Sequence, residues 1–106
     1  MSLQFGSENV ALRNAIRRIV SSSTVAVRFR RHAEIAMDER EFDHADVFVC
    51  LAKGMAYGPE VQNNELRANV VHRGKRIRVV VGGLDDVNGD WSQLTRITVV
   101  TVIEAP

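Results

Sequence analysis

The segment from Arg28 to Arg40 holds the residues of this chain best suited to chemistry on an anion. It contains four arginines and one histidine within thirteen residues, mixed with alanine, isoleucine and methionine, which favour burial. Histidine exchanges protons near neutral pH, and arginine binds a phosphate through two parallel hydrogen bonds. His32 is therefore the candidate acid or base, and Arg40 is a candidate for holding a phosphate.

The net charge of +1 conceals a segregation of charge along the chain. Residues 1–31 hold six arginines and one acid, residues 32–65 hold eight acids and two bases, and residues 66–84 hold five bases and no acid. If the two basic blocks fold together, they form a face that binds polyanions. Mutual neutralisation of the acidic and basic surfaces is the alternative, and both stay open. The candidates for holding a nucleic-acid backbone are Arg31, Arg76 and Arg78.

Each candidate also has a purely structural explanation. His32 could cap its helix or lie at the edge of the core, and Arg40 could pair with a nearby acid such as Glu39. Arg76 and Arg78 could be solvated strand residues that need no function. The three histidines lack the paired spacing with which helices bind zinc, so we expect no metal and no other cofactor.

Three helices are predicted in the first half of the chain. Residues 8–21 repeat apolar side chains at helical spacing, with Ser7 as the expected N-cap. Residues 31–41 form the second helix. A third helix follows the N-cap Asp43, which begins a capping box, and it ends at a C-cap on Gly54.

The second half of the chain predicts an antiparallel sheet of about four strands. Residues 66–72 and 76–81 alternate apolar and polar side chains. Gly74-Lys75 between them suits a two-residue hairpin turn whose first residue has positive φ, and this turn predicts a register in which Val71 lies opposite Arg78. Residues 97–103 form the strand richest in β-branched side chains, and residues 55–61 form a weaker edge strand.

The expected fold class is α+β, a single domain over residues 1–106 with the helices packed on one face of the sheet. A short strand at Val25–Val27 could precede the second helix. That helix would place His32 in its first turn and Arg40 in its last turn, while Arg78 would point outward from the hairpin.

Composition limits the function classes that remain. The chain is 45% apolar and 25% charged, as is usual for globular proteins. No apolar run approaches the roughly 20 residues of a membrane span, and no signal-peptide core is seen, so we expect a cytoplasmic protein without a membrane partner. Cys50 is the only cysteine and lies in an apolar run, which predicts a small buried residue. A homodimer formed by pairing of this edge strand with that of a second copy stays an open alternative.

The order and spacing of several motifs resemble a small bacterial domain family that is catalogued as uncharacterised. The motifs are Arg31-His32-Ala33, the later Met37, Glu39 and Arg40, a capped helix ending in Lys53-Gly54, and two strands at Arg76–Gly82 and Ile97–Thr101. That family is similar to the RelE-like and barnase-like ribonuclease toxins, in which helices pack on an antiparallel sheet. The resemblance covers about residues 25–104 and leaves the first helix outside it.

The resemblance implies a RelE-like fold and metal-independent cleavage of RNA by a toxin that a cognate antitoxin neutralises. In such a reaction the RNA 2′-hydroxyl attacks the adjacent phosphate, while the protein supplies a base, an acid and cations. His32 and Arg40 are then the catalytic candidates, and Arg31, Arg76 and Arg78 bind RNA. The alternatives on the same fold are a protein-interaction module and an RNA-binding domain without cleavage.

Overall fold

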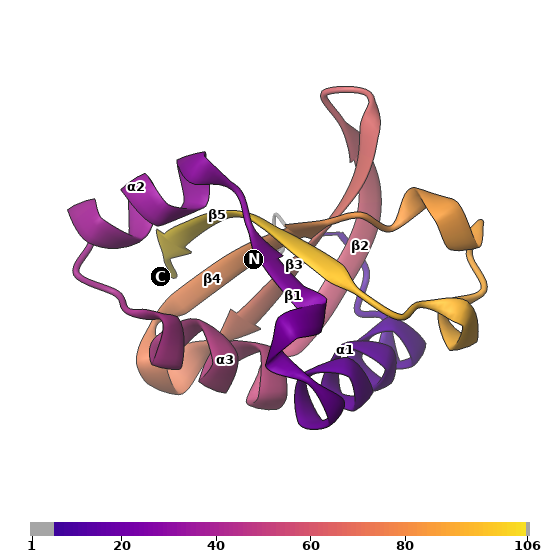
Figure 1. Ribbon diagram of the computed structural model, residues 1–106. Helices are drawn as coiled ribbons and strands as arrows, with labels where there is room; N and C mark the ends of the chain where they lie inside the picture. Colours follow the sequence, from indigo (N-terminus) through magenta and orange to yellow (C-terminus); the bar gives the residue numbers. More distant parts are fainter. Residues whose placement is uncertain (1–5, 106) are drawn as a thin grey trace.

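The computed structural model describes residues 6–105, which form three α-helices and a five-stranded sheet (Figure 1). The strand order is β1 (Val27–Phe29), β5 (Ile97–Glu104), β4 (Ile77–Gly82), β3 (Glu65–His72) and β2 (Met55–Gln62). Strand β1 pairs with β5 in parallel, and the other neighbouring strands are antiparallel.

The expected α+β class is confirmed, but the expected sheet of four antiparallel strands is wrong. The fifth strand is β1. The short strand expected at Val25–Val27 is shifted, because Thr24–Ala26 form a 3-10 turn and the strand covers Val27–Phe29, which is too short for an alternating pattern to set its bounds. It is also the strand that pairs in parallel. A parallel neighbour must arrive through a long connection, and a local sequence pattern cannot reveal such a pairing.

Helices α1 (Val10–Ser22) and α3 (His44–Lys53) lie on one face of the sheet, and α2 (Arg31–Glu39) lies beside β5 (Figure 1). Leu12 and Ile16 of α1 are fully buried with Leu51 of α3, so the first helix belongs to the same core as the others. The tip of the β2–β3 hairpin projects to the side of the sheet opposite α1 and α3 (Figure 1).

Helix α3 begins and ends where the sequence predicts. The Asp43 carboxylate accepts the Asp46 backbone N–H at 2.9 Å, and the Asp46 carboxylate accepts the Asp43 N–H at 3.0 Å, which completes the capping box. At the other end the Gly54 N–H donates to the Cys50 carbonyl at 2.7 Å. A Cβ atom on Gly54 would lie 2.6 Å from that oxygen, so a glycine is required there.

The predicted N-cap of α1 is wrong, because Asn9 rather than Ser7 caps the helix. The Asn9 side chain accepts the Leu12 N–H at 2.9 Å. Ser7 instead accepts the Gly58 N–H on its carbonyl at 2.8 Å, and the Asn9 N–H donates to Ala56 at 2.8 Å. Residues 7–9 thus run along β2 before the helix starts, and they occupy part of the edge of β2.

The β3–β4 hairpin has the predicted register but a different turn. Val71 lies opposite Arg78, as predicted. The chain reverses through a single 3-10 turn, and positive φ falls on Arg76, at 55°, rather than on Gly74. The ring of His72 accepts a backbone N–H of this turn at 3.1 Å. The predicted two-residue turn is therefore wrong. The contact with His72 stabilises the longer turn that forms instead.

Candidate nucleic-acid interface

Arginine side chains gather on the face of the sheet opposite α1 and α3. In β3, Ala68 and Val70 pack into the core, so the alternate residues Arg67 and Asn69 point to the other face. The same alternation directs Arg28 of β1 and Arg78 of β4 outward. We call this surface the arginine face, and we define it by Arg28, Arg30, Arg67 and Arg78.

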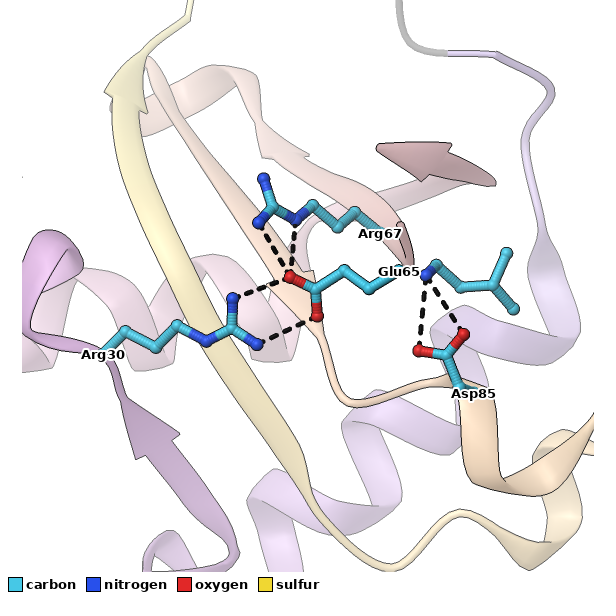
Figure 2. A network of polar contacts seen from close by, with 5 residues as sticks. Arg30, Glu65, Arg67 and Asp85 are labelled. Carbon is cyan, nitrogen blue, oxygen red and sulfur yellow. Dashed lines mark hydrogen bonds and ion pairs between the residues drawn. The ribbon is translucent and has the colours of Figure 1, made fainter. Parts of the chain in front are cut away.

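Glu65 joins two of these arginines. Its carboxylate accepts two hydrogen bonds from Arg30, at 2.7 and 2.9 Å, and two from Arg67, at 2.7 and 2.9 Å. Figure 2 shows Arg30 extending across β5 to reach Glu65, while Arg67 approaches from β3. The Arg30 hydrogen bond, opposed by partial burial and supported by Arg67, lowers the pKa of Glu65 to about 2. The same hydrogen bond raises the pKa of Arg30.

The backbone around Glu65 is fixed on both sides. Residues 63–64 form the tight β2–β3 turn, with φ values of 50° and 64°. The next N–H, that of Leu66, donates to both carboxylate oxygens of Asp85 at 3.3 Å (Figure 2). On β4, Gly82 leaves room for the Glu65 carboxylate, because a Cβ atom there would lie 3.1 Å from Glu65 Oε1. The backbone on both sides therefore fixes the position of the Arg30–Glu65–Arg67 bridge, the name we use for the hydrogen bonds that join these three side chains.

Arg78 occupies the middle of the arginine face. Its Nε donates to Oδ1 of Asn69 at 2.8 Å, and Asn69 is only 5% exposed. Burial lowers the pKa of Arg78, although an arginine remains protonated across the physiological range. Arg78 is thus a cation held in a defined orientation on the sheet.

A polar concavity of about 280 Å³ opens at one side of this face, lined by Arg28, Phe29, Arg30 and Thr98. Arg28 lies directly opposite Thr98 in the β1–β5 register. Arg28 is exposed, and it has no hydrogen-bond or ion-pair partner within residues 6–105. Two guanidinium groups and a hydroxyl border one small space. This arrangement suits an oxyanion, because guanidinium and hydroxyl groups both donate hydrogen bonds to the oxygen atoms of an anion.

A larger cavity of about 550 Å³ lies elsewhere, between α1 and residues 89–92. Its cation, Arg18, donates hydrogen bonds of 3.1 Å to the carbonyls of Trp91 and Leu94. Arg18 therefore attaches the loop to the helix, and its donors are engaged by the backbone.

The structure places the predicted catalytic pair at the two ends of α2. His32 lies in its first turn, and Arg40 follows its last residue, roughly 12 Å away at 1.5 Å per residue. Both side chains are exposed, and Arg40 is 3.9 Å from its neighbour Glu39. Glu34 contacts His44 of α3 at 3.1 Å. His32 precedes Glu34 by two positions, so it lies on the opposite flank of α2, away from α3.

The predicted RNA-binding residues also lie in separate places. Arg31 is exposed at the start of α2, and Arg76 is exposed in the β3–β4 turn. Of this group, Arg78 lies on the arginine face, and none of the five predicted site residues lines either cavity described above. The structure therefore does not gather the predicted residues in one cleft.

Sequence reasoning missed Arg28, Arg30 and Arg67 as candidate site residues. Alternation of polar and apolar residues could have directed Arg67 to the outer face beside Arg78. No sequence signal could have placed Arg28 and Arg30 there, because their position depends on the parallel pairing of β1 with β5. The role of Glu65 was missed for the same reason.

Cys50 is buried, as predicted. Its Sγ lies 3.3 Å from the Val70 carbonyl oxygen, and burial raises the pKa of the thiol to about 12. A thiol that does not ionise near neutral pH is no nucleophile.

Comparisons of the chain with models of protein families, with curated proteins and with solved structures found no match. The RelE-like resemblance consequently remains a prediction. Within residues 6–105, no helix has both the length and the apolar character that crossing a bilayer requires. Over the same residues, no three histidine, cysteine or acidic side chains are grouped so that they could hold a metal ion.

Proposed function

We propose that this chain is an RNA-directed domain of the toxin type, which binds the RNA backbone on the arginine face and cleaves RNA without a metal ion. The observation that supports this proposal is the gathering of four arginines on the sheet face opposite α1 and α3. Three acids accompany them: Glu65, Glu60, which lies opposite Arg67, and Glu8, which lies opposite Tyr57. An excess of positive charge on one face binds the phosphate backbone of a nucleic acid without reading its sequence.

In the proposed reaction His32 transfers the proton. The 2′-oxygen forms a bond to the adjacent phosphorus, the bond from phosphorus to the 5′-oxygen breaks, and a 2′,3′-cyclic phosphate and a 5′-hydroxyl result. Neutral His32 accepts the proton of the 2′-hydroxyl, and the protonated ring then supplies a proton to the leaving 5′-oxygen. His32 is exposed on the flank of α2 that faces away from α3. An RNA strand bound on the arginine face could therefore reach it.

Arg40 is proposed to contact a phosphate beyond the one that reacts, because it lies at the far end of α2 from His32. Arg31 and Arg76 would add backbone contacts at the margins of the face. A cognate antitoxin would neutralise the domain by covering the arginine face with acidic side chains.

Binding is tested with a fluorescently labelled single-stranded RNA at several salt concentrations. The variant Arg28→Ala/Arg78→Ala should bind more weakly, and its salt dependence should fall by about two phosphate contacts. The matched control Lys53→Ala removes a charge at the end of α3, on the other side of the sheet, and should bind as the wild type does. Equal binding by all three proteins would refute the proposed interface.

Cleavage is tested with His32→Ala. We expect this variant to lose cleavage while it keeps RNA binding and a melting temperature close to that of the wild type, because His32 is exposed. Cleavage products with 5′-hydroxyl ends would support the metal-independent route. RNA that is bound but never cut by the wild type would identify an RNA-binding module instead, and the absence of both would identify a protein-interaction module.

A further inference from the structure

Arg30 contributes to two features at once. Its two Nη atoms donate to Glu65, at 2.7 and 2.9 Å, and the same residue lines the concavity beside Arg28. A guanidinium has five N–H donors, so the bond to Glu65 leaves about three of them for another acceptor. Arg30 therefore connects the internal carboxylate with the concavity.

The concavity offers donors and contains no acid. Its polar side chains are Arg28, Arg30 and Thr98, and Thr98 lies beside Arg28 because the two residues are paired in register. The Arg28 guanidinium has no partner within the described residues. A small space bordered by two cations and a hydroxyl selects an anion that accepts several hydrogen bonds, and phosphate is the anion that arginine pairs match best.

Glu65 presents to Arg30 the same arrangement of oxygen atoms that a phosphate would present. A carboxylate and a phosphate both accept two parallel hydrogen bonds from one guanidinium. Glu65 is also bound by Arg67, so it keeps one cationic partner when Arg30 is withdrawn. Exchange of Arg30 between Glu65 and an incoming anion thus leaves no charge unpaired.

We propose that the concavity of Arg28, Arg30 and Thr98 binds a single phosphate group of an RNA backbone, and that Glu65 competes with that phosphate for Arg30. The identification of the phosphate as part of an RNA rests on the proposed function. The competition itself depends only on the geometry of Glu65 and the two arginines that bind it. Glu65 would weaken binding of isolated phosphates and favour chains that engage the whole arginine face.

The site is tested by titrating the full-length protein with inorganic phosphate and following backbone amide signals by nuclear magnetic resonance. The amides of Arg28 and Thr98 should shift most. Glu65→Gln removes the competing charge and should tighten phosphate binding roughly tenfold, the effect of one charge-assisted hydrogen bond. Arg28→Ala should weaken it by a similar factor, while Lys53→Ala should leave it unchanged.

A second variant covers the case in which Glu65→Gln does not fold. Glu65→Asp keeps the charge but shortens the side chain, so it should release Arg30 in part and tighten phosphate binding less than Glu65→Gln would. Equal phosphate affinity in the wild type and in whichever Glu65 variants fold would overturn the competition. Signal shifts centred away from Arg28 and Thr98 would overturn the site.

Parallel titrations with single-stranded RNA separate this inference from the proposed function. If phosphate binds more tightly to Glu65→Gln but no protein binds RNA, the inference holds and the proposed function fails. If RNA binds the wild type, Glu65→Gln and Arg28→Ala equally well, the inference fails, and an RNA-binding function that uses other arginines remains.

Discussion

The Glu65 carboxylate lies directly over Gly82, so that a Cβ atom on Gly82 would be 3.1 Å from Glu65 Oε1. The same Cβ would be 3.1 Å from a methyl group of Val100. Glu65 starts on β3 and must pass β4 to reach Arg30, and the missing side chain at Gly82 leaves the path open. This glycine is therefore needed for its small volume, since its φ is not in the left-handed region.

Gly82→Ala should weaken the Arg30–Glu65 pair without unfolding the protein. The carboxylate must move by a few tenths of an ångström, while the alanine stabilises the fold by about 0.4–1 kcal/mol through the entropy of the unfolded chain. We expect the free energy of unfolding to change by less than about 1 kcal/mol. A double-mutant cycle between Arg30→Ala and Glu65→Gln, measured by urea unfolding in both backgrounds, should give a smaller coupling energy with Gly82→Ala. An unchanged coupling energy would show that Gly82 does not control the bridge.

The Arg30–Glu65–Arg67 bridge should make the free energy of unfolding depend on pH in the acidic range. The pKa of Glu65 is lowered in the folded protein to about 2, below its unfolded value near 4.5. Its contribution is therefore complete above about pH 4.5 and is lost as the pH falls toward 2. Because the Arg30 side chain is 41% exposed, solvent screening limits the loss to about 1 kcal/mol.

Urea unfolding of the wild type and of Glu65→Gln at pH 5, 4, 3 and 2 checks this dependence. The free energy of unfolding of the wild type should fall more steeply over this range, and the two curves should converge at the acid end. Parallel curves for the two proteins would mean that the bridge contributes nothing to stability.

The N-cap of α3 gives a prediction with a built-in control. Asp43→Ala removes the acceptor of the Asp46 N–H and should lower the free energy of unfolding by about 1 kcal/mol. Ser7→Ala removes a side chain that sequence alone assigns as a cap, but Ser7 bonds to Gly58 through its backbone oxygen. The free energy of unfolding of Ser7→Ala should therefore stay within about 0.5 kcal/mol of the wild-type value. Urea unfolding at neutral pH measures both values, and a larger loss for Ser7→Ala would restore the original assignment.

Cys50 should be unreactive in the folded protein. Its side chain is fully buried, and burial raises the pKa of the thiol to about 12, so the reactive thiolate is scarce. A chromogenic disulfide reagent should label it only as fast as the protein unfolds, and labelling should become fast in denaturing urea. Rapid labelling of the native protein would contradict the buried placement.

The parts of the fold that sequence predicted are those that depend on near neighbours. The capping box of α3 involves Asp43 and Asp46, which are three positions apart, and it was predicted correctly. The pairing of Val71 with Arg78 follows from alternation on both sides of one turn, and it was also predicted correctly. By contrast, the cap at Asn9 depends on residues 7–9 pairing with β2, which no local pattern reveals.

The same distinction applies to the candidate site. The basic blocks were visible as composition, and Arg78 was placed outward by alternation. The join between the two blocks is the Arg30–Glu65–Arg67 bridge, whose outer members are 37 positions apart along the chain. Contacts of that separation depend on strand order, which one sequence without the structure does not fix.

The pairing of β1 with β5 determines when the concavity beside Arg28 can form during synthesis of the chain. Val27 pairs with Ile97, so β1 has no neighbour on the sheet until β5, which follows it by about 70 residues, has left the ribosome. Contacts so distant in sequence form late in folding. The concavity between Arg28 and Thr98 is therefore absent from every nascent chain in which β5 has not yet been made, and Arg28 and Thr98 come together only once residues 97–99 can pair with β1.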